Sequence, residues 1–591
     1  MKNEIKNRKE VVYVGYNDTS NFVYSKFKNT LFNFKGKDFV KNNILNTLGE
    51  EYLDNFKVFD KKSGKVSYDM DAVAKEIVMQ CKLSGVFEEE NVRQSGIFIN
   101  KNNELIINND GKVWTKNEDK ENVVIDGCVY QNGRNIGIDR KTDFLLTNYE
   151  TSKLFKEFEK VKFKNGTQDL YNLVGWVATA PFAGIDVYNG VDQTRTMMSL
   201  TGQLGSGKST VLKRINEMLG NFAMKYAGTS SEAGIRQKMG RNALTIIADE
   251  LESEHKNVDD LIAMLRVAYS GDEIVRGSAD NKTAQVFTLK MNALIAGINP
   301  PKLSPADASR FITIELDKLE MNELNTLEFM LLEDFEDEKK FDFKSFGKRL
   351  TRFMIEYYDV YKTIEKVLAS YLESKGATKR FASTHKGVMA SAFMIKNPES
   401  IIFRNSNSID KIDSYSDDCF KYKKQDYTEI EKKLYNNFKT KFDFILLKEF
   451  LEEYKIDEMI EESFGNKDED NLIDIILSSG IKSLTIGYDS VINHLFCYRN
   501  SKKDYKKLLG DMGMKFTDNE VEGSFLTIDT LDINFMKMLK GTKFEKSDIK
   551  KVITRSPLVE ALNKEESIGN KTRSRRGLIK LTIDTDKYKI D

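Results

Sequence analysis

A glycine-rich octet at residues 202–209 reads G-x-x-x-x-G-K-S and is compatible with few local folds. An apolar run at 197–201 precedes it and is typical of a buried strand, and a segment with helical spacing follows at 210–219. Glycines at this spacing let the backbone wrap around a polyphosphate, so that amide N–H groups and the start of a helix face the anion. The residues expected to surround the phosphates are Gly202, Gln203, Leu204, Gly205, Ser206, Gly207, Lys208, Ser209 and Thr210.

Two side chains of this octet have expected roles in binding. We expect Lys208 to contact the β- and γ-phosphates and the Ser209 hydroxyl to bind Mg²⁺. The chain is therefore predicted to bind a nucleoside triphosphate, ATP, together with Mg²⁺.

The composition limits the class of protein. The 591 residues carry 91 basic and 91 acidic side chains, so bulk charge does not indicate nucleic-acid binding, which has to come from local patches or from a pore built by several subunits. The four cysteines lie far apart, which argues against a zinc site or a disulfide framework. The sequence has no long apolar run and no apolar signal core at its start, so we expect a cytoplasmic location and no membrane partner.

The residue pattern divides the chain into five segments, and the predicted fold class is α/β. Residues 1–64 have no clear role. An α+β lead-in is expected at 65–180, with a β-meander and then helices. Strand and helix alternate over 181–320, as expected of a P-loop ATPase core. A helical lid is expected at 321–430, and an α/β, winged-helix-like domain with a basic tract at 431–591.

An acidic pair follows the next apolar run. Residues 243–248 read as a strand that ends in Asp249 and Glu250. Phosphoryl transfer depends mainly on positioning and charge neutralisation, so we expect a neighbouring strand to bring Asp249 to the Mg²⁺ and Glu250 to orient and deprotonate the attacking water. The alternative is an ordinary strand that ends in exposed acids.

Two polar residues near further strand ends are catalytic candidates. Asn299 follows the apolar run 292–298 and is suited to sense the γ-phosphate or the water, although an asparagine before proline also forms simple turns. Arg310 stands just before the strand-like run 312–316 and suits an arginine finger that enters a neighbouring subunit's site, with a surface salt bridge as the alternative. The arginine-finger interpretation makes the active unit a ring of identical subunits. Arg380 is a weaker candidate for a second nucleotide sensor.

Basic residues in two other places are candidates for DNA contacts. Residues 273–287 predict a hairpin whose tip would face a pore, with a solvated hairpin as the alternative. In the C-terminal segment, helix-like stretches at 545–552 and 557–562 precede a basic β-segment, which suits a winged helix or else a solvated loop. The expected nucleic-acid contacts are Arg276, Lys282, Arg573, Arg575 and Arg576.

Together these residues resemble the ATPase half of phage and prophage primase-helicases, within the AAA+ and superfamily 3 helicase group. Further stretches similar to that family lie at 85–96, 175–181, 230–237, 275–279 and 577–581. The resemblance implies an AAA+-like core, a ring-shaped oligomer and ATP-driven translocation on single-stranded or forked DNA, with a primase or other replication protein as a partner. The first 60 residues are too short for the family's primase module, so the chain looks like the helicase part alone.

The sequence leaves a second function open. An ATP-switched DNA-binding initiator, or a defence or regulatory assembly ATPase, would use the same site without processive unwinding. In that case the basic tract at 571–576 would bind duplex DNA. A small-molecule kinase is a third, more remote interpretation, because the flanking segments are larger than the core.

Overall fold

The computed structural model of the chain describes residues 9–59, 66–185, 195–252, 257–271, 273–277, 284–298, 301, 303–318, 341–405, 442–465, 480–483, 487–490, 509–519, 523–539, 549–550, 559–562, 566–568, 571–573 and 578–582. Packing divides the chain into two compact units. The first comprises 1–301, 310–374 and 378–455, and the second comprises 302–309, 375–377 and 456–591. No helix within the described ranges is both long and apolar enough to cross a bilayer.

The first unit begins with a three-stranded antiparallel sheet: β1 (Val11–Tyr16), β2 (Asn21–Ser25) and β3 (Thr30–Phe34). Three helices pack on it: α1 (Lys41–Leu48), α2 (Glu50–Asp54) and α3 (Met70–Ser84). A hairpin, β4 (Lys57–Phe59) and β5 (Val66–Tyr68), lies between α2 and α3 in the sequence. Val11, Phe34 and Ile77 belong to one buried core, so α3 completes the small domain that the first strands begin.

Short strands follow as the predicted meander. They are β6 (Val92–Arg93), β7 (Gly96–Ile99), β8 (Leu105–Asn109), β9 (Lys112–Trp114), β10 (Asp119–Lys120), β11 (Val124–Ile125) and β12 (Cys128–Tyr130). Strands β7 to β10 form one antiparallel sheet, and β6, β11 and β12 form a mixed sheet in which β12 runs antiparallel to β11 and parallel to β6. The backbone N–H of Ala243 donates to the Ser95 carbonyl at 2.8 Å, which attaches the meander directly to the strand that carries the acidic pair.

The nucleotide core is a five-stranded parallel sheet: β13 (Met197–Gly202), β14 (Ala223–Ala227), β15 (Leu244–Asp249), β18 (Met291–Gly297) and β19 (Phe311–Leu316). The order across the sheet is β14-β15-β18-β13-β19. Every residue of β18 is buried, as expected for a central parallel strand covered on both faces. The expected α/β fold class is therefore confirmed for the core.

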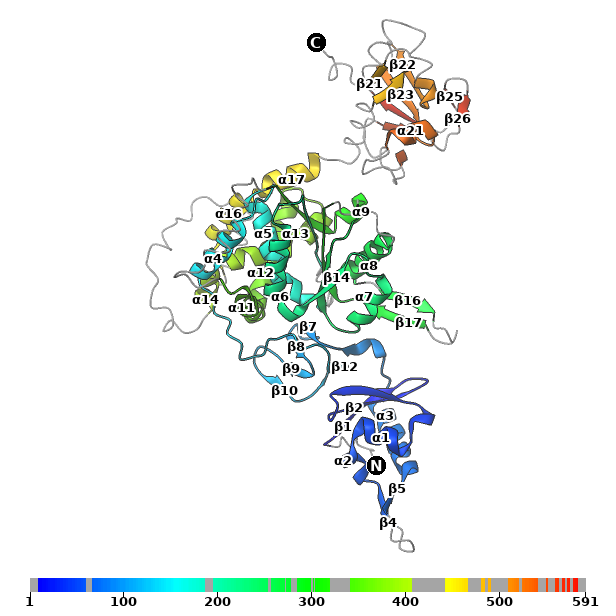
Figure 1. Cartoon of the computed structure of the whole chain (residues 1–591), viewed down its shortest axis with the longest axis vertical. Helices are drawn as coiled ribbons and strands as arrows, with labels where there is room; N and C mark the ends of the chain where they lie inside the picture. The colour runs from blue at the N-terminus through cyan, green and yellow to red at the C-terminus, as the bar shows by residue number, and fades with distance from the viewer. Residues whose placement is uncertain are drawn as a thin grey trace. The chain divides into compact units, whose positions relative to one another are not determined.

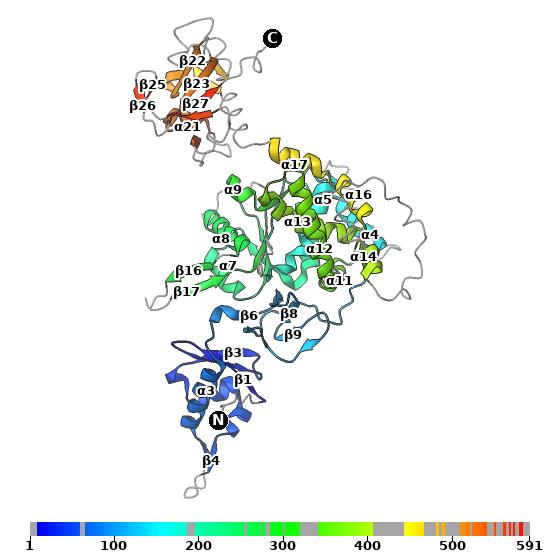
Figure 2. The same cartoon turned by 180° about the vertical axis from the view of Figure 1, so that it is seen from behind.

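Helices cover this sheet. Those that follow its strands are α6 (Lys208–Leu219), α7 (Glu232–Met239) and α8 (Val258–Ser270). A bundle is formed by α4 (Asn148–Glu159), α5 (Thr167–Thr179), α11 (Phe343–Glu356), α12 (Tyr358–Ser374), α13 (Lys379–Lys396), α14 (Pro398–Asn405) and α16 (Phe444–Glu453). Figures 1 and 2 show the bundle on one side of the sheet, and α7 and α8 on the other. A side chain at Gly347 of α11 would overlap the Met218 carbonyl of α6, so these two helices are in direct backbone contact.

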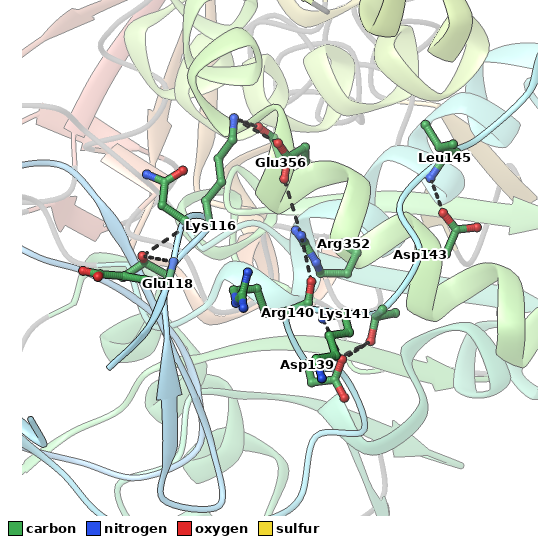
Figure 3. Close-up of polar contacts among 12 residues, drawn as sticks. Lys116, Glu118, Asp139, Arg140, Lys141, Asp143, Leu145, Arg352 and Glu356 are labelled. Carbon is green, nitrogen blue, oxygen red and sulfur yellow. Dashed lines mark hydrogen bonds and ion pairs between the residues drawn. The ribbon is translucent and has the colours of Figure 1, made fainter. Parts of the chain in front are cut away.

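Helix α11 also holds the meander (Figure 3). The Lys116 ammonium donates to the Glu356 carbonyl at 2.6 Å and lies 3.3 Å from its carboxylate. The Arg352 guanidinium donates to the Arg140 carbonyl at 3.4 Å and lies 5.4 Å from the Trp114 ring centroid. Arg352 is 2% exposed, and this burial lowers its pKa. The meander is thus fixed to the helix that lies against α6.

The second unit contains α9 (Pro305–Ala308), α17 (Ile456–Gly465) and α21 (Ile533–Met538). A four-stranded antiparallel sheet, in the order β22-β23-β27-β24, is built from β22 (Met514–Asn519), β23 (Gly523–Asp529), β24 (Val559–Ala561) and β27 (Leu578–Thr582). Two hairpins pair β20 (Gly480–Ser483) with β21 (Gly487–Ser490), and β25 (Glu566–Ile568) with β26 (Lys571–Arg573). The helical expectation for 557–562 is wrong, because Val559 pairs with Leu581 across the sheet. The winged helix stays a prediction.

Candidate nucleotide-binding site

The glycine-rich octet folds as the turn between β13 and α6, at the carboxyl edge of the sheet. Gly205 and Gly207 have φ angles of +83° and +81°, a left-handed conformation that residues with a Cβ rarely adopt. At the start of the turn, a Cβ on Gly202 would overlap the Ser206 hydroxyl oxygen. The turn therefore depends on its small residues, as the sequence indicated.

The turn leaves hydrogen-bonding groups for an anion. Gly207 is the N-cap of α6, and no side chain caps the helix. The first amide N–H groups of a helix have no acceptor within it, so they are available to phosphate oxygens. The Ser206 hydroxyl is buried and has no hydrogen-bond partner among the described residues. These residues fit a triphosphate, with Lys208 and Ser209 on the first helical turn.

The acidic pair lies at the same edge of the sheet, at the end of β15. The Asp249 carboxylate accepts the Glu250 backbone N–H at 2.9 Å, and both side chains are exposed. Glu250 has a φ of +56°, which costs on the order of 1 kcal/mol for a residue that is not glycine. This left-handed residue ends the strand and turns the chain away from it.

The strand order corrects one expectation. The acidic strand was expected beside the strand that carries the glycine-rich turn, but β18 lies between β15 and β13. Two strand spacings separate β15 from β13, roughly 10 Å. Side chains, a phosphate and a metal ion together are large enough to span this gap. Sequence could not reveal the order, because β18 enters the sheet from a segment that follows both strands.

Glu252 is a site residue that the sequence reasoning missed. Its carboxylate accepts the Ile298 backbone N–H at 2.8 Å, and the Leu251 N–H donates to the Ala296 carbonyl at 2.8 Å. These bonds tie the end of β15 to the end of β18, directly before Asn299. Asn299 itself lies outside the described residues. The available signal was the third acid in the run Asp249-Glu250-Leu251-Glu252.

Arg310 is placed at the opposite edge of the sheet. Strand β19 runs parallel to β13, with Met197 beside Phe311 and Gly202 beside Leu316. Arg310 precedes β19, so it lies more than five residue steps from the glycine-rich turn of its own chain, roughly 17 Å. The structure does not bring these two candidates together within one subunit.

Arg380 lies near that same opposite edge. It is in the first turn of α13, and Thr384 follows one helical turn later. The Thr384 carbonyl accepts the hydroxyl of Thr196, the residue that precedes β13, at 2.8 Å. Arg380 is therefore not placed beside the glycine-rich turn of its own chain.

The candidate DNA contacts are described only in part. The expected hairpin is confirmed by β16 (Glu273–Gly277) and β17 (Ala284–Thr288), in which Arg276 pairs with Gln285. Figures 1 and 2 show this hairpin beside α7 and α8. Arg573 ends β26. Lys282, Arg575 and Arg576 lie outside the described residues, so their DNA contacts stay predictions.

Comparisons with known proteins give distant likenesses. No protein-family profile matches the chain, and no curated protein matches it. A solved structure described as SCCmec type IV Cch, an active helicase, is 12% identical over 96% of this chain and 91% of its own, with a TM-score of 0.47. The apo C-terminal region of NrS-1 is 10% identical over 51% of this chain and 86% of its own, with a TM-score of 0.24. A Cytophaga hutchinsonii protein described as a candidate ATPase is 16% identical over 42% of this chain and 81% of its own, with a TM-score of 0.26.

The geometry of the chain itself is more informative. A parallel sheet carries a glycine-rich turn that opens a helix, and an acidic pair ends a strand at the same edge. This arrangement has the architecture of a P-loop NTPase core.

Proposed function

We propose that the chain is an ATP-dependent DNA helicase or translocase of phage or mobile-element replication, which acts as a ring of identical subunits with ATP at their interfaces. The observation that carries this proposal is that Arg310 and the glycine-rich turn lie at opposite ends of two adjacent parallel strands, β19 and β13. An arginine at that edge is out of reach of its own subunit's nucleotide but can reach a neighbour's. Head-to-tail contacts of this kind generate closed rings when their rotation closes.

Each residue of the site has a stated role in this proposal. Lys208 and the amides of the turn bind the phosphates, while Ser209 and Asp249 hold Mg²⁺, which neutralises phosphate charge. Glu250 orients the attacking water and accepts its proton. Arg310 of the adjacent subunit donates to the phosphate oxygens that gain charge in the transition state, a task for which a planar guanidinium suits better than an ammonium.

Movement on DNA is assigned to the hairpin β16–β17. It lies in the sequence between α8 and β18, so it is connected to the strand whose end Glu252 ties to the acidic pair. We assign Arg276 and Lys282 to a single strand in the pore, and Arg573, Arg575 and Arg576 to phosphates outside it.

Turnover of ATP with and without single-stranded DNA, together with unwinding of a forked duplex, tests this function. We expect DNA to stimulate ATP turnover and the duplex to separate only when ATP is hydrolysed. Electron microscopy with a non-hydrolysable ATP analogue should show a ring with Arg310 at the neighbour's nucleotide. Slow ATP turnover that does not change when DNA is added, together with protection of duplex DNA only in footprinting, would instead indicate the ATP-switched initiator.

A further inference from the structure

The edge of the sheet that carries Arg310 contains an aromatic support for this residue. The guanidinium carbon of Arg310 lies 5.6 Å from the centroid of the Tyr269 ring. Tyr269 belongs to the last turn of α8 and is 7% exposed. A guanidinium over an aromatic ring is attracted to the negative face of the ring, which favours one orientation of the planar group.

The ring of Tyr269 is itself held from the other side. Its hydroxyl lies 3.0 Å from the Thr384 hydroxyl on α13, and Thr384 is fully buried. The Thr384 carbonyl accepts the Thr196 hydroxyl at 2.8 Å, and the next residue, Met197, donates its N–H to the Arg310 carbonyl at 3.2 Å. These contacts connect Tyr269 to both the side chain and, through Thr384 and the start of β13, the backbone of Arg310.

We propose that Tyr269 is a positioning residue, which holds the Arg310 guanidinium in the orientation in which it enters the neighbouring subunit's nucleotide site. This inference rests on the proposed function, because it requires the arginine to act between subunits. An arginine side chain has many rotamers, and fixing them before the reaction removes an entropic cost from the transition state. Thr384 supports the same arrangement by fixing the tyrosine ring.

The expected signature is a loss of turnover without a loss of binding. A group that acts on charge developed in the transition state changes kcat more than KM. We expect Tyr269→Leu to lower kcat for ATP about tenfold and to change KM less than about twofold. Tyr269→Phe and Thr384→Val keep the apolar packing and remove the bond between the two hydroxyls, so we expect about a threefold lower kcat. In the Arg310→Ala background, Tyr269→Leu should cause no further loss.

Mixing of subunits tests the inference in the full-length protein. Lys208→Ala subunits cannot hydrolyse ATP but still offer an intact Arg310 and Tyr269 to a neighbour. Arg310→Ala and Tyr269→Leu subunits have an intact glycine-rich turn, so each should regain turnover when mixed with Lys208→Ala subunits. Damage confined to the fold of the Tyr269→Leu subunit would not be repaired in this way. If Tyr269→Leu does not fold, the Tyr269→Phe and Thr384→Val proteins are mixed instead.

The outcomes separate this inference from the proposed function. If Arg310→Ala is not rescued by Lys208→Ala, the shared site is wrong and both proposals fall. If Arg310→Ala is rescued but none of the Tyr269 or Thr384 variants is, or if all of them turn over ATP like the parent, only the positioning role falls. Tyr68→Leu serves as the matched control. It removes a cation–π pair in the N-terminal domain, in which the Lys41 ammonium lies 4.8 Å from the centroid of the Tyr68 ring. It should leave ATP turnover unchanged.

Discussion

The two edges of the parallel sheet are built in different ways. At the carboxyl edge, one continuous octet supplies the glycine-rich turn, and a second short run supplies the acidic pair. At the opposite edge, Tyr269, Arg310 and Thr384 come from three segments that are far apart in the sequence. The first edge is a local motif, whereas the second exists only in the folded chain. If one edge binds the nucleotide of its own subunit and the other acts on the neighbour's nucleotide, substitutions at the two edges should have different effects on binding and turnover.

The largest effect is expected at the glycine-rich turn. Lys208→Ala should lower ATP turnover at least about a thousandfold, because the charge that binds the phosphates is lost. Steady-state phosphate release measures this effect. Lys213→Ala is the matched control, since Lys213 is exposed on the same helix, and it should stay within about twofold of the parent. Equal ATP turnover of the Lys208→Ala protein and the parent would show that the octet is not part of the site of ATP hydrolysis.

A substitution at the opposite edge of the sheet should lower ATP turnover without changing the affinity for ATP. Arg310→Ala is expected to lower kcat about a thousandfold and to leave the affinity for an ATP analogue within about threefold, since an arginine finger acts on the transition state. Titration with a fluorescent analogue and single-turnover hydrolysis separate the two quantities. A large loss of affinity with unchanged kcat would place Arg310 at the ground-state nucleotide.

The conformation of the turn should be visible in affinity. Gly207→Ala forces a side chain into a left-handed position and should weaken ATP binding about tenfold. Gly220→Ala is the control, because Gly220 also has a positive φ, +53°, but follows the other end of α6. It should lower the melting temperature and leave ATP affinity unchanged. Similar losses of affinity in both variants would show that strain in α6 alone is responsible.

Glu252→Ala should have a moderate effect at the carboxyl edge. It removes the acceptor of the Ile298 N–H, so the end of β18 is no longer tied to the end of β15. We expect kcat to fall about fivefold with little change in KM. Glu252→Gln retains an oxygen acceptor and should recover most of this loss. If Glu252→Gln and Glu252→Ala lower kcat equally, the negative charge of Glu252 is required and its hydrogen bond with the Ile298 N–H is not.

The smallest effect is on stability. Burial raises the pKa of Asp169 from 3.8 to about 6, and the hydrogen bonds from Asn165 only partly oppose this shift. A raised folded-state pKa contributes stability below the unfolded value of 3.8, and this contribution is lost as pH rises through 6. Asp169→Asn should therefore be more stable than the parent at pH 7.5, by on the order of 3 kcal/mol, with little difference near pH 4.

An activity comparison accompanies the melting curves. ATP turnover of the Asp169→Asn protein at low temperature should match that of the parent, since Asp169 is not at the Arg310 edge. A constant difference in melting temperature across this pH range would contradict the assigned pKa.

The sequence predicted the features that local patterns determine. The glycine-rich turn, the meander strands and the hairpin β16–β17 each follow from residue types over a few positions, and the structure confirms them. The placement of β18 between β15 and β13 depends on pairing between distant segments, which leaves no local signal. Glu252 was missed because its role is defined by the Ile298 N–H that it accepts. The helical expectation for 557–562 is wrong because pairing with β27 outweighs the local preference of so short a run.

The contact between Gly347 and Met218 has a mechanical consequence. With no side chain between the two backbones, α11 cannot slide along α6 without steric collision. Lys116 and Arg352 attach the meander to the other end of α11, so the meander is connected to α6 through α11. A displacement of α6 at the phosphates would therefore act on the meander through α11, although the two segments are far apart in the sequence.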